Sequence, residues 1–549
     1  MTKFMKAQRD AKQKELEQIL ISPECAPFWK EKGHNLKAVF VQPDKLKTVK
    51  LSAGMQIVAD HVYKNTPYDV DFASIYSKDV MEMFTKGDKI TSFFNNWDIR
   101  DVDVIGFSIS NPSVMSNVFE FFEKANISIL KSERNINNSP LIIAGGLGVL
   151  NPVPYEDFFD AFVIGEGSIA ASEMLLYNML ERQSSISEVD ILTSMSKVNG
   201  VYIPEYTKSV DFQTIDDVAG TRRASLLMSK DKALIFADYS CKSKCGFCEI
   251  THVRGDYSFQ GVEPIKEYLK EFDSIGVETA TLAGCSVTNI PTSDLIEVFD
   301  WSHSNLKITN PVIRSVRIDH LPKIASYLDQ TEVHIAPETG SDFLRNKVMM
   351  KGFSNKIILE NLESVIDKAS LVRLYHIVGV PGEEQADRDA YIDLVGSVSS
   401  MLDKHHDSNK IEIYMYPLLS QPHTPLEEYP IIGLDVFKEY SEHFINGATN
   451  IVKDSTSLYI HPLEPIWHLM QGICNLGDFK AGEVLYRGYS LGNDLESYCK
   501  ACDEFGVDWR NEFSAPYMNI PWDFVKIDNQ NQVFELKKKI WNNLYNRKR

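Results

Sequence analysis

Long apolar runs are missing from this sequence: nowhere do about 18 apolar residues follow one another, which excludes an ordinary membrane-spanning helix. An apolar leader is missing too. Residues 1–20 are rich in Lys, Gln and Glu, so they predict an exposed helix rather than a signal peptide and favour a cytoplasmic protein. Positive charge is scarce, with 57 Lys and Arg against 76 Asp and Glu, and the net charge of −19 argues against nucleic acid as the main partner. Cysteine is scarce as well, because eight in 549 residues are too few for a disulfide framework and fit a reducing compartment.

Three of those eight cysteines are gathered in one loop. Cys241, Cys245 and Cys248 form a C-x-x-x-C-x-x-C that follows an apolar strand-like run at 233–237. Three thiolates at this spacing can hold three of the four irons of a [4Fe-4S] cluster, which leaves the fourth iron without a protein ligand. The alternative is a zinc knuckle, which needs four closed ligands, and His252 is the nearby residue that such a site would have to recruit.

The first third of the chain alternates strands with helices. Strands are predicted at 36–41, 70–75, 102–109, 141–144 and 161–164, and helices at 53–64 and 114–124. This rhythm is typical of an α/β, doubly wound parallel sheet of Rossmann or flavodoxin type, which binds ligands at the carboxyl ends of its strands. Glycine pairs follow two of these strands, at Gly145-Gly146 and at Gly165 and Gly167. These glycines can serve to let a large or phosphate-bearing ligand approach the backbone closely, or they can simply form tight turns.

From residue 232 the pattern is that of a barrel. Strands are predicted at 234–237, 279–283, 313–318, 333–336, 371–378 and 411–416, with helices between them such as 264–275 and 355–369. The prediction is a partial (β/α)6 TIM-like barrel whose site lies at the carboxyl ends of its strands. The predicted domains are a helical leader (1–35), the doubly wound sheet (36–182), a linker (183–231), the barrel (232–430) and a mainly helical region (431–549).

Several longer stretches resemble one family in the same order along the chain. They read GFSISNPSVMSNVF, AGGLGVLNPVPYEDFFDAFVIGEG, the cysteine loop with its aromatic Phe247, APETGSDFLRNKVMMKG, VGVPGEE, QPHTPL and IPWD. Together they resemble radical S-adenosylmethionine (SAM) enzymes that carry a cobalamin-binding domain before the barrel. The resemblance implies three cofactors: a [4Fe-4S] cluster, SAM and cobalamin.

The resemblance also assigns residues to each cofactor. For cobalamin these are Ser108, Ser110, Gly145, Gly146, Asn151, Pro152, Gly165, Glu166 and Gly167. For SAM they are Phe247, Gly284, Arg317, Glu338 and Gly379, and for the cluster Cys241, Cys245 and Cys248. Each polar SAM residue has a structural alternative as part of a salt bridge or a turn. The Asp-x-His-x-x-Gly motif, whose His ligates cobalt in other cobalamin proteins, is missing. The lower face of cobalt is therefore expected to be open, water-bound or met by another side chain.

The function implied is methyl transfer to an unactivated carbon through a 5′-deoxyadenosyl radical and methylcobalamin. Side chains expected near the substrate are Tyr375, His376, Tyr414, Tyr416 and Arg254. The expected partners are a small-molecule or peptide substrate and a flavodoxin- or ferredoxin-type electron donor. Three alternatives stay open: rearrangement or cyclisation without methyl transfer, RNA modification of the methylthiotransferase kind, and a silent scaffold that binds SAM.

The late pair Cys499 and Cys502 has two interpretations. A C-x-x-C can belong to an auxiliary cluster or a redox pair, but two thiols without a second pair nearby favour buried, reduced cysteines.

Overall fold

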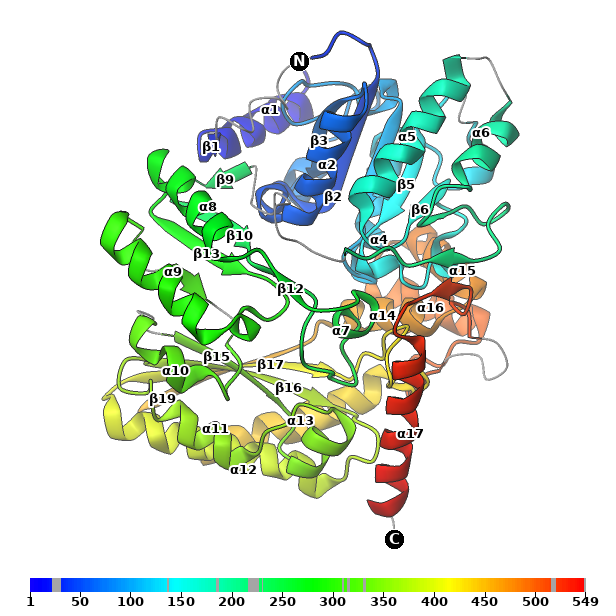
Figure 1. Cartoon of the computed structure of the whole chain (residues 1–549). Helices are drawn as coiled ribbons and strands as arrows, with labels where there is room; N and C mark the ends of the chain where they lie inside the picture. The colour runs from blue at the N-terminus through cyan, green and yellow to red at the C-terminus, as the bar shows by residue number, and fades with distance from the viewer. Residues whose placement is uncertain are drawn as a thin grey trace.

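A computed structural model describes residues 1–21, 31–135, 138–183, 187–215, 227–229, 231–308, 311–313, 316–328, 332–514 and 520–547 of the chain. Figure 1 shows an N-terminal α/β unit at the top, an open barrel of parallel strands below it, and C-terminal helices on the right. Within these described ranges, no helix combines the length and the apolar character that crossing a bilayer requires.

The N-terminal unit is built on a six-stranded sheet with the order β3-β2-β4-β5-β6-β7. The first five strands are parallel and β7 runs antiparallel to β6. The bounds are β2 Lys37–Lys45, β3 Asp69–Ile75, β4 Val104–Ser108, β5 Leu141–Gly145, β6 Ala161–Val163 and β7 Val201–Tyr202. The five strands predicted here are confirmed, and their order reverses between β2 and β4, as in flavodoxin-like sheets.

Both faces of this sheet are covered by helices, as a parallel sheet requires. One face packs on α2 (Ala53–Asn65), α5 (Gly167–Gln183) and α6 (Glu188–Met195). The other packs on α4 (Met115–Lys124) and on three helices from the far end of the chain, α14 (Pro465–Leu476), α15 (Phe479–Leu491) and α16 (Leu495–Phe505). The C-terminal helices therefore complete the core of the N-terminal sheet.

The sequence predicted an exposed leader helix, but part of this helix is buried. In α1 (Lys3–Leu16) Phe4 and Lys12 are buried, and the Phe4 ring meets Tyr76 and Phe84 edge to face. The prediction missed this because a single apolar stripe in a polar helix gives a faint periodic signal.

The barrel consists of two groups of parallel strands. Its first group contains β10 (Lys232–Phe236), β13 (Thr279–Ala283) and β14 (Val312–Ile313), and its second β15 (Glu332–Glu338), β16 (Leu371–Val378), β17 (Asn409–Pro417) and β19 (Thr456–Pro462). Helices α8 (Val262–Ser274), α9 (Thr292–Asn305), α11 (Asn355–Leu362), α12 (Gln385–His405) and α13 (Leu434–Ile451) lie outside the strands. The prediction of a partial barrel is confirmed.

The barrel differs from its prediction at two strands. The third strand was expected at 313–318, but β14 ends at Ile313, and residues 314–315 lie outside the described part of the chain. A seventh parallel strand, β19, pairs with β17 inside the region predicted as mainly helical. β19 is an edge strand whose Tyr459 is exposed, so its alternation of polar and apolar residues has a weak contrast.

Short elements tie the ends of the chain to its middle. β1 (Ile19–Ile21) pairs with β9 (Leu227–Ser229), β8 (Val210–Asp211) with β21 (Val525–Lys526), and β18 (Ile431–Ile432) with β20 (Glu512–Phe513). The last described helix, α17 (Gln530–Arg547), runs along the outside of the barrel and is drawn in red in Figure 1.

Candidate functional site

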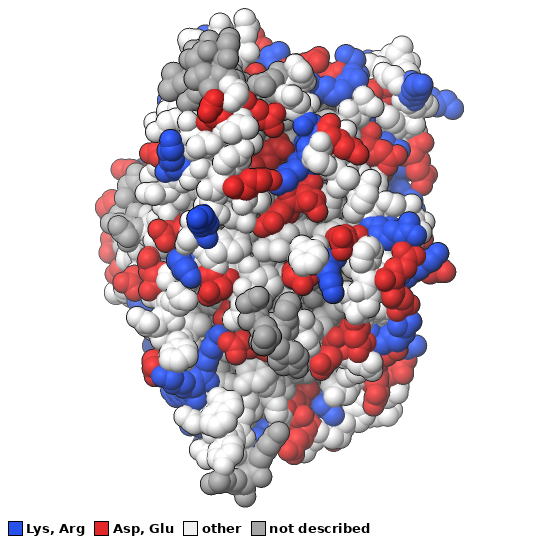
Figure 2. All heavy atoms as spheres, turned by 90° about the vertical axis from the view of Figure 1, so that its right-hand side faces the viewer, with Lys and Arg blue, Asp and Glu red and all other residues white. Residues whose placement is uncertain are grey.

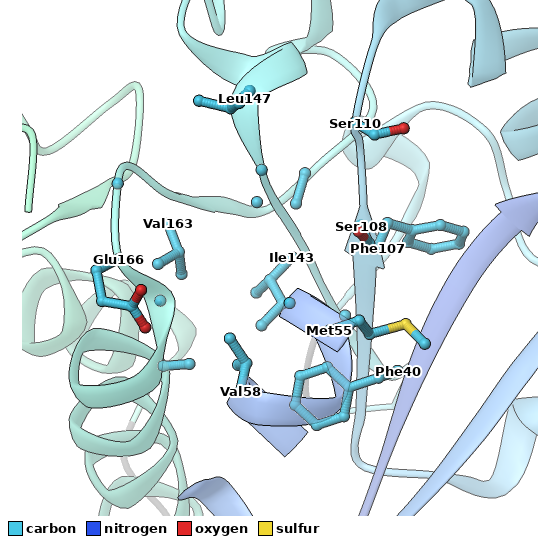
Figure 3. Close-up of a pocket in the computed structure, with 18 of the residues that line it drawn as sticks. Phe40, Met55, Val58, Phe107, Ser108, Ser110, Ile143, Leu147, Val163 and Glu166 are labelled. Carbon is cyan, nitrogen blue, oxygen red and sulfur yellow. The ribbon is translucent and has the colours of Figure 1, made fainter. Parts of the chain in front are cut away.

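A cavity of about 320 Å³ opens at the carboxyl ends of β4, β5 and β6, beside β2. Figure 3 shows that its walls are mainly apolar, with Ser108, Ser110 and Glu166 among the polar side chains; Ser52 and Arg254 are further polar lining residues. We call it the glycine-loop cavity; its lining includes Phe40, Met55, Val58, Phe107, Ser108, Ser110, Ile143, Gly145, Gly146, Leu147, Val163, Gly165, Glu166, Gly167 and Arg254. Its position at the edge where strand order reverses is the usual place for a ligand in such a sheet.

Two glycines of this cavity are required by the protein's own backbone. Gly146 has φ of +111°, and an added Cβ would lie 2.6 Å from the carbonyl oxygen of Ile109. Gly165 has φ of +98°, and an added Cβ would lie 2.3 Å from the carbonyl oxygen of Gln213. The glycines thus let neighbouring segments of the chain cross closely, which gives the loops their shape.

Asn151 and Pro152, which the sequence assigned to cobalamin, are not part of the cavity lining. Both are buried, and the Asn151 amide donates to the carbonyl oxygens of Cys474, at 3.0 Å, and Gly477, at 2.7 Å. Asn151 therefore supplies hydrogen-bond donors to carbonyl groups that have no partner within the helix at the end of α14. These bonds join the glycine loop to the C-terminal helices.

The cysteine loop lies between β11 (Asp238–Tyr239) and α7 (Ile250–Val253). The Asn289 amide donates to the Cys241 sulfur at 3.3 Å, and the Ser243 N–H donates to the same sulfur at 3.4 Å. The Gly246 N–H donates to the carbonyl of Met349 at 3.0 Å, which fixes the loop to the barrel. Hydrogen bonds to cysteine sulfur are a feature of iron–sulfur sites, so these residues fit the cluster that the motif predicts.

His252 does not supply the fourth ligand that a zinc site would need. It is fully buried, and its Nε2 lies 2.9 Å from the carbonyl oxygen of Cys245, to which it donates. In the described ranges of the chain, no three His, Cys, Asp or Glu side chains are placed to hold one metal ion. The three thiols of the loop are therefore not arranged as a closed single-ion site.

A second cavity, of about 270 Å³, adjoins the cysteine loop at the carboxyl ends of β15, β16 and β17. We call it the cluster-side cavity; it is lined by Phe247, Cys248, Glu249, Glu338, Tyr375, Ile377, Tyr416, Pro417, Leu418, Leu419 and Gln421. The structure thus brings together Phe247, Glu338, Tyr375 and Tyr416, four residues that the sequence had placed near SAM or substrate.

Glu338 reaches this cavity in an unusual backbone conformation, with φ of +63°. Its carboxylate is paired with the Lys351 ammonium at 2.6 Å, and Lys351 also donates to the carbonyl of Ala336 at 2.7 Å. Lys351 was not predicted. A left-handed conformation in a residue other than glycine is characteristic of functional sites, where surrounding contacts hold it in place.

Arg317 was predicted to bind the SAM carboxylate, but in the structure its guanidinium forms hydrogen bonds within the protein. Its guanidinium makes two hydrogen bonds of 3.0 Å to the Asp319 carboxylate. It also donates to the Ser243 hydroxyl, within the cysteine loop, at 2.5 Å. This arrangement is the structural ion pair of the alternative interpretation, and it anchors the loop.

His376, which was expected near the substrate, does not line the cluster-side cavity. Side chains along β16 alternate between the two faces of the sheet, and Tyr375 faces the cavity, so its neighbour His376 faces the outer helices. The His376 ring stacks on Tyr391 with centroids 3.8 Å apart. Tyr414 is the cross-strand partner of Tyr375, and their rings stack at 5.8 Å, but Tyr414 is not part of the cavity lining.

Gly284 and Gly379 have structural reasons to be glycine. A Cβ on Gly284 would lie 2.0 Å from the carboxylate of Asp238, and one on Gly379, where φ is +75°, would lie 2.9 Å from Ile432. Asp238 was not predicted. Burial raises the pKa of its carboxyl to about 7, although the N–H groups of Cys285, at 2.6 Å, and Ser286 lower it. Its position three residues before the first cysteine of the loop is the signal that could have identified it.

Arg254, which was expected near the substrate, lies just after the cysteine loop and reaches the glycine-loop cavity. It follows α7, six residues after Cys248, and lines the glycine-loop cavity. It also lines a cavity of about 70 Å³ together with Gly146, Gly165, Glu166 and Tyr239. Its guanidinium donates to the Cys285 thiol at 3.4 Å and lies 5.2 Å from the centre of the Tyr239 ring. Arg254 therefore connects the segment that follows the cysteine loop with the glycine loops.

Cys499 and Cys502 lie in α16, away from both cavities. Cys502 is fully buried and Cys499 is half-buried, and both are free thiols. The predicted burial is thus confirmed for Cys502, whereas Cys499 is only partly buried.

Comparison with known proteins agrees with this architecture. Residues 54–204 match the model of the N-terminal region of radical SAM proteins, and residues 239–395 match the radical SAM superfamily model. An uncharacterized protein of Methanocaldococcus jannaschii is 26% identical over 347 residues, which cover 61% of this chain and 70% of that protein. A ribosomal protein uS12 methylthiotransferase RimO of Hydrogenobaculum is 24% identical over 299 residues, which cover 51% of this chain and 68% of that protein.

Solved structures give the same fold. The radical SAM methyltransferase TsrM from Kitasatospora setae, solved with cobalamin and a [4Fe-4S] cluster bound, aligns with a TM-score of 0.51 at 12% identity, over 85% of this chain and 99% of that one. The two family models together cover more than half of the 549 residues, and the chain belongs to the radical SAM superfamily.

Proposed function

We propose that this protein is a cobalamin-dependent radical SAM methyltransferase that acts on an unactivated carbon. The observation that carries the proposal is the position of Arg254. This residue belongs to the segment that follows the cysteine loop, yet it lines the cavity of the N-terminal sheet. A reaction that needs both a cluster and a second cofactor requires the two sites to lie near each other, and the reach of Arg254 from the end of one site to the other supports this.

When bound, the cluster supplies the electron that cleaves SAM, and cobalamin carries the methyl group. Cys241, Cys245 and Cys248 hold the cluster. The glycine-loop cavity, at about 320 Å³, is at the small end of ligand sites and takes only part of a molecule as large as cobalamin. TsrM, which has the same fold and was solved with cobalamin bound, supports this assignment.

The protein's own side chains position and enclose the reactants. Glu338 lines the cluster-side cavity, and its ion pair with Lys351 holds its carboxylate in place. Tyr375 and Tyr416 supply an aromatic wall opposite the cysteine loop, where we place the substrate. The substrate class is a small molecule or a peptide side chain.

A second candidate is methylthio transfer. The match to RimO covers 68% of that protein and favours this reaction over other radical chemistry. The acidic charge of the chain argues against an RNA substrate, so a protein side chain is the substrate class for this alternative.

Anaerobic incubation of the reconstituted protein with SAM, reductant and cobalamin tests the proposal. Methyl transfer predicts both 5′-deoxyadenosine and S-adenosylhomocysteine, with dependence on added cobalamin. 5′-Deoxyadenosine alone supports rearrangement, and a methylthio mass increment on a product supports the second candidate. A Cys245→Ala variant is the control, because it cannot hold the cluster and must lose 5′-deoxyadenosine formation.

A further inference from the structure

Three rings stand in a row on the inner face of the barrel's second group of strands. The Tyr375 and Tyr414 rings stack with their centres 5.8 Å apart, and the Tyr414 and His461 rings with their centres 4.9 Å apart. The three residues are cross-strand partners on β16, β17 and β19, and we call them the ring row. Tyr414 has a ring on each side, whereas Tyr375 and His461 stand at the two ends of the row.

Neighbouring groups hold the ring row in place. The Arg373 guanidinium lies 5.6 Å from the centre of the Tyr414 ring and makes hydrogen bonds of 2.9 and 2.6 Å to the Glu412 carboxylate. The Tyr391 hydroxyl donates to the backbone carbonyl of Tyr375 at 2.9 Å. Rings that are already fixed lose little freedom when a ligand packs on them, so the row is a preorganised platform.

The fourth strand of this sheet carries a small residue at the level of the ring row. β15 and β16 stay in register up to Ile335, so the next residue of β15, Ala336, lies beside Tyr375. The buried side chains of β15, such as Ile335, face the outer helices, and Ala336 is half-buried on the inner face. A methyl group therefore stands where the three neighbouring strands each have a ring.

The end of the ring row at Tyr375 opens into the cluster-side cavity. Tyr375 lines that cavity together with Glu338, from the end of β15, and Phe247, from the cysteine loop. Among the residues that the structure describes, Tyr414 is the one ring that stacks on Tyr375. The second face of the Tyr375 ring is therefore turned toward the place beside Ala336, where the cavity leaves room for a ligand.

Charge decides between the possible sources of a ring that would stack there. A nucleobase within a nucleic acid arrives with its phosphates, which bind to basic surfaces. On the side of the molecule drawn in Figure 2, Lys and Arg are scattered among Asp and Glu, and the whole chain has a net charge of −19. A ring that belongs to a small molecule or to a peptide side chain needs no basic surface and fits this protein better.

We propose that the cluster-side cavity takes an aromatic ring of the substrate, which stacks on the second face of Tyr375 and extends the ring row over Ala336. The inference rests on the proposed function and deepens it, because it names the part of the substrate that is recognised beside the cysteine loop. Stacked aromatic rings attract each other beyond the effect of the area that they bury. Tyr375 and Ala336 thus determine specificity for an aromatic substrate.

The test measures binding to the full-length protein, reconstituted with its cluster, saturated with SAM and kept without reductant so that no turnover occurs. The two probes are N-acetyl-L-phenylalaninamide and N-acetyl-L-cyclohexylalaninamide, which differ in whether the ring is aromatic, and calorimetry gives their dissociation constants. Burial of apolar area alone does not favour the phenyl ring, because the saturated ring is the larger of the two. Stacking on Tyr375 predicts that the phenyl probe binds about three- to tenfold more tightly.

Four variants locate the binding site. Tyr375→Leu should abolish the preference for the phenyl probe, and Tyr375→Phe, which keeps a ring, should retain it. Ala336→Phe puts a ring of the protein in the position of the ligand, so the phenyl probe should bind about tenfold more weakly or worse. Tyr459→Leu is the matched control, because Tyr459 is an exposed tyrosine of β19 outside the ring row, and it should leave both dissociation constants unchanged. The visible absorption of the cluster and the affinity for SAM show that each variant is folded.

Other results overturn the inference. Equal affinities for the two probes in the wild type, or binding of neither, exclude a stacking site. A phenyl probe that binds when SAM is left out, but not in its presence, assigns this face of Tyr375 to the adenine of SAM. Displacement of the phenyl probe by a short RNA assigns it to a nucleobase, and a preference that survives Tyr375→Leu places the ring elsewhere.

Failure of the proposed function is seen separately. A wild-type protein that shows no cluster absorption after reconstitution contradicts the proposed function before any probe is added. A protein that binds the cluster and SAM, but does not prefer the phenyl probe, contradicts the aromatic substrate and leaves the proposed function standing.

Discussion

Replacing Gly165 by Ala tests whether the shape of the glycine loops depends on a close crossing of two backbone segments. The added Cβ would lie 2.3 Å from the carbonyl oxygen and 2.4 Å from the nitrogen of Gln213. Because the backbone fixes the position of Cβ, only a movement of the backbone can relieve this clash. Two hydrogen bonds hold this crossing: the Glu166 N–H donates to Gln213 O at 2.8 Å, and the Gln213 N–H donates to Ile164 O at 3.1 Å. The substitution should separate the segments and break both bonds.

The chain offers a matched control for this change. Gly87 has φ of +99°, nearly the +98° of Gly165, but a Cβ built on it meets nothing within 4 Å. Both substitutions incur the strain of a positive φ, about 1–2 kcal/mol, and the same loss of unfolded-state entropy. Gly165→Ala additionally loses two backbone hydrogen bonds at about 1 kcal/mol each, so it should be less stable than Gly87→Ala by about 2 kcal/mol or more.

Urea unfolding followed by circular dichroism measures the difference. Binding of hydroxocobalamin, followed by absorbance, should weaken in Gly165→Ala and stay at the wild-type level in Gly87→Ala. If the two variants differ in stability by less than about 0.5 kcal/mol, the crossing at Gln213 does not shape the loop and the reasoning fails.

Three further changes follow from the positions of single side chains. His376→Phe keeps the stack on Tyr391 and loses one hydrogen bond, so it should cost about 1 kcal/mol of stability and slow SAM cleavage less than Tyr375→Ala does; the opposite ranking would place His376 in the cavity. Asn151→Ala should cost about 2 kcal/mol through its two lost bonds with unchanged cobalamin affinity, and a large loss of affinity would contradict its structural role. Asp238→Asn tests the raised pKa of about 7: the folded carboxyl binds its proton more tightly than the unfolded one, so the wild type loses stability as pH rises from about 4 through about 7, and the variant should gain relative to it over the same range in urea unfolding. A difference between the two proteins that does not vary with pH would contradict that assignment.

The sequence predicted the strands of both units because apolar runs of strand length alternate with helical periodicity. The prediction that the three cysteines hold a cluster also came from the sequence, because few kinds of site use this spacing of thiols within one loop. The edge strand β19 escaped prediction because one of its faces is open to solvent around Tyr459, which removes the contrast between its faces. Likewise, no local signal indicates that α14, α15 and α16 complete the core of a sheet more than 300 residues earlier in the chain.

Within the site, errors arose where a prediction ignored which way a side chain points. Tyr375 and His376 are adjacent in a strand and cannot face the same cavity. Arg317 was expected to bind a ligand, but Asp319, two residues later, occupies its guanidinium. Arg254 was expected near the substrate, and its place against the glycine loops was not predicted, because the direction of the chain after α7 leaves no local signal in the sequence.

The central claim is that the cavity of the N-terminal sheet holds cobalamin against the cysteine loop. Retention of cobalamin tests it most directly: the purified protein is mixed with hydroxocobalamin, passed through gel filtration and examined by its visible spectrum. The account predicts that cobalamin elutes with the wild-type protein in a one-to-one ratio and is lost from a Gly146→Val variant, whose side chain would clash with Ile109. Elution of the wild-type protein free of cobalamin would contradict the account.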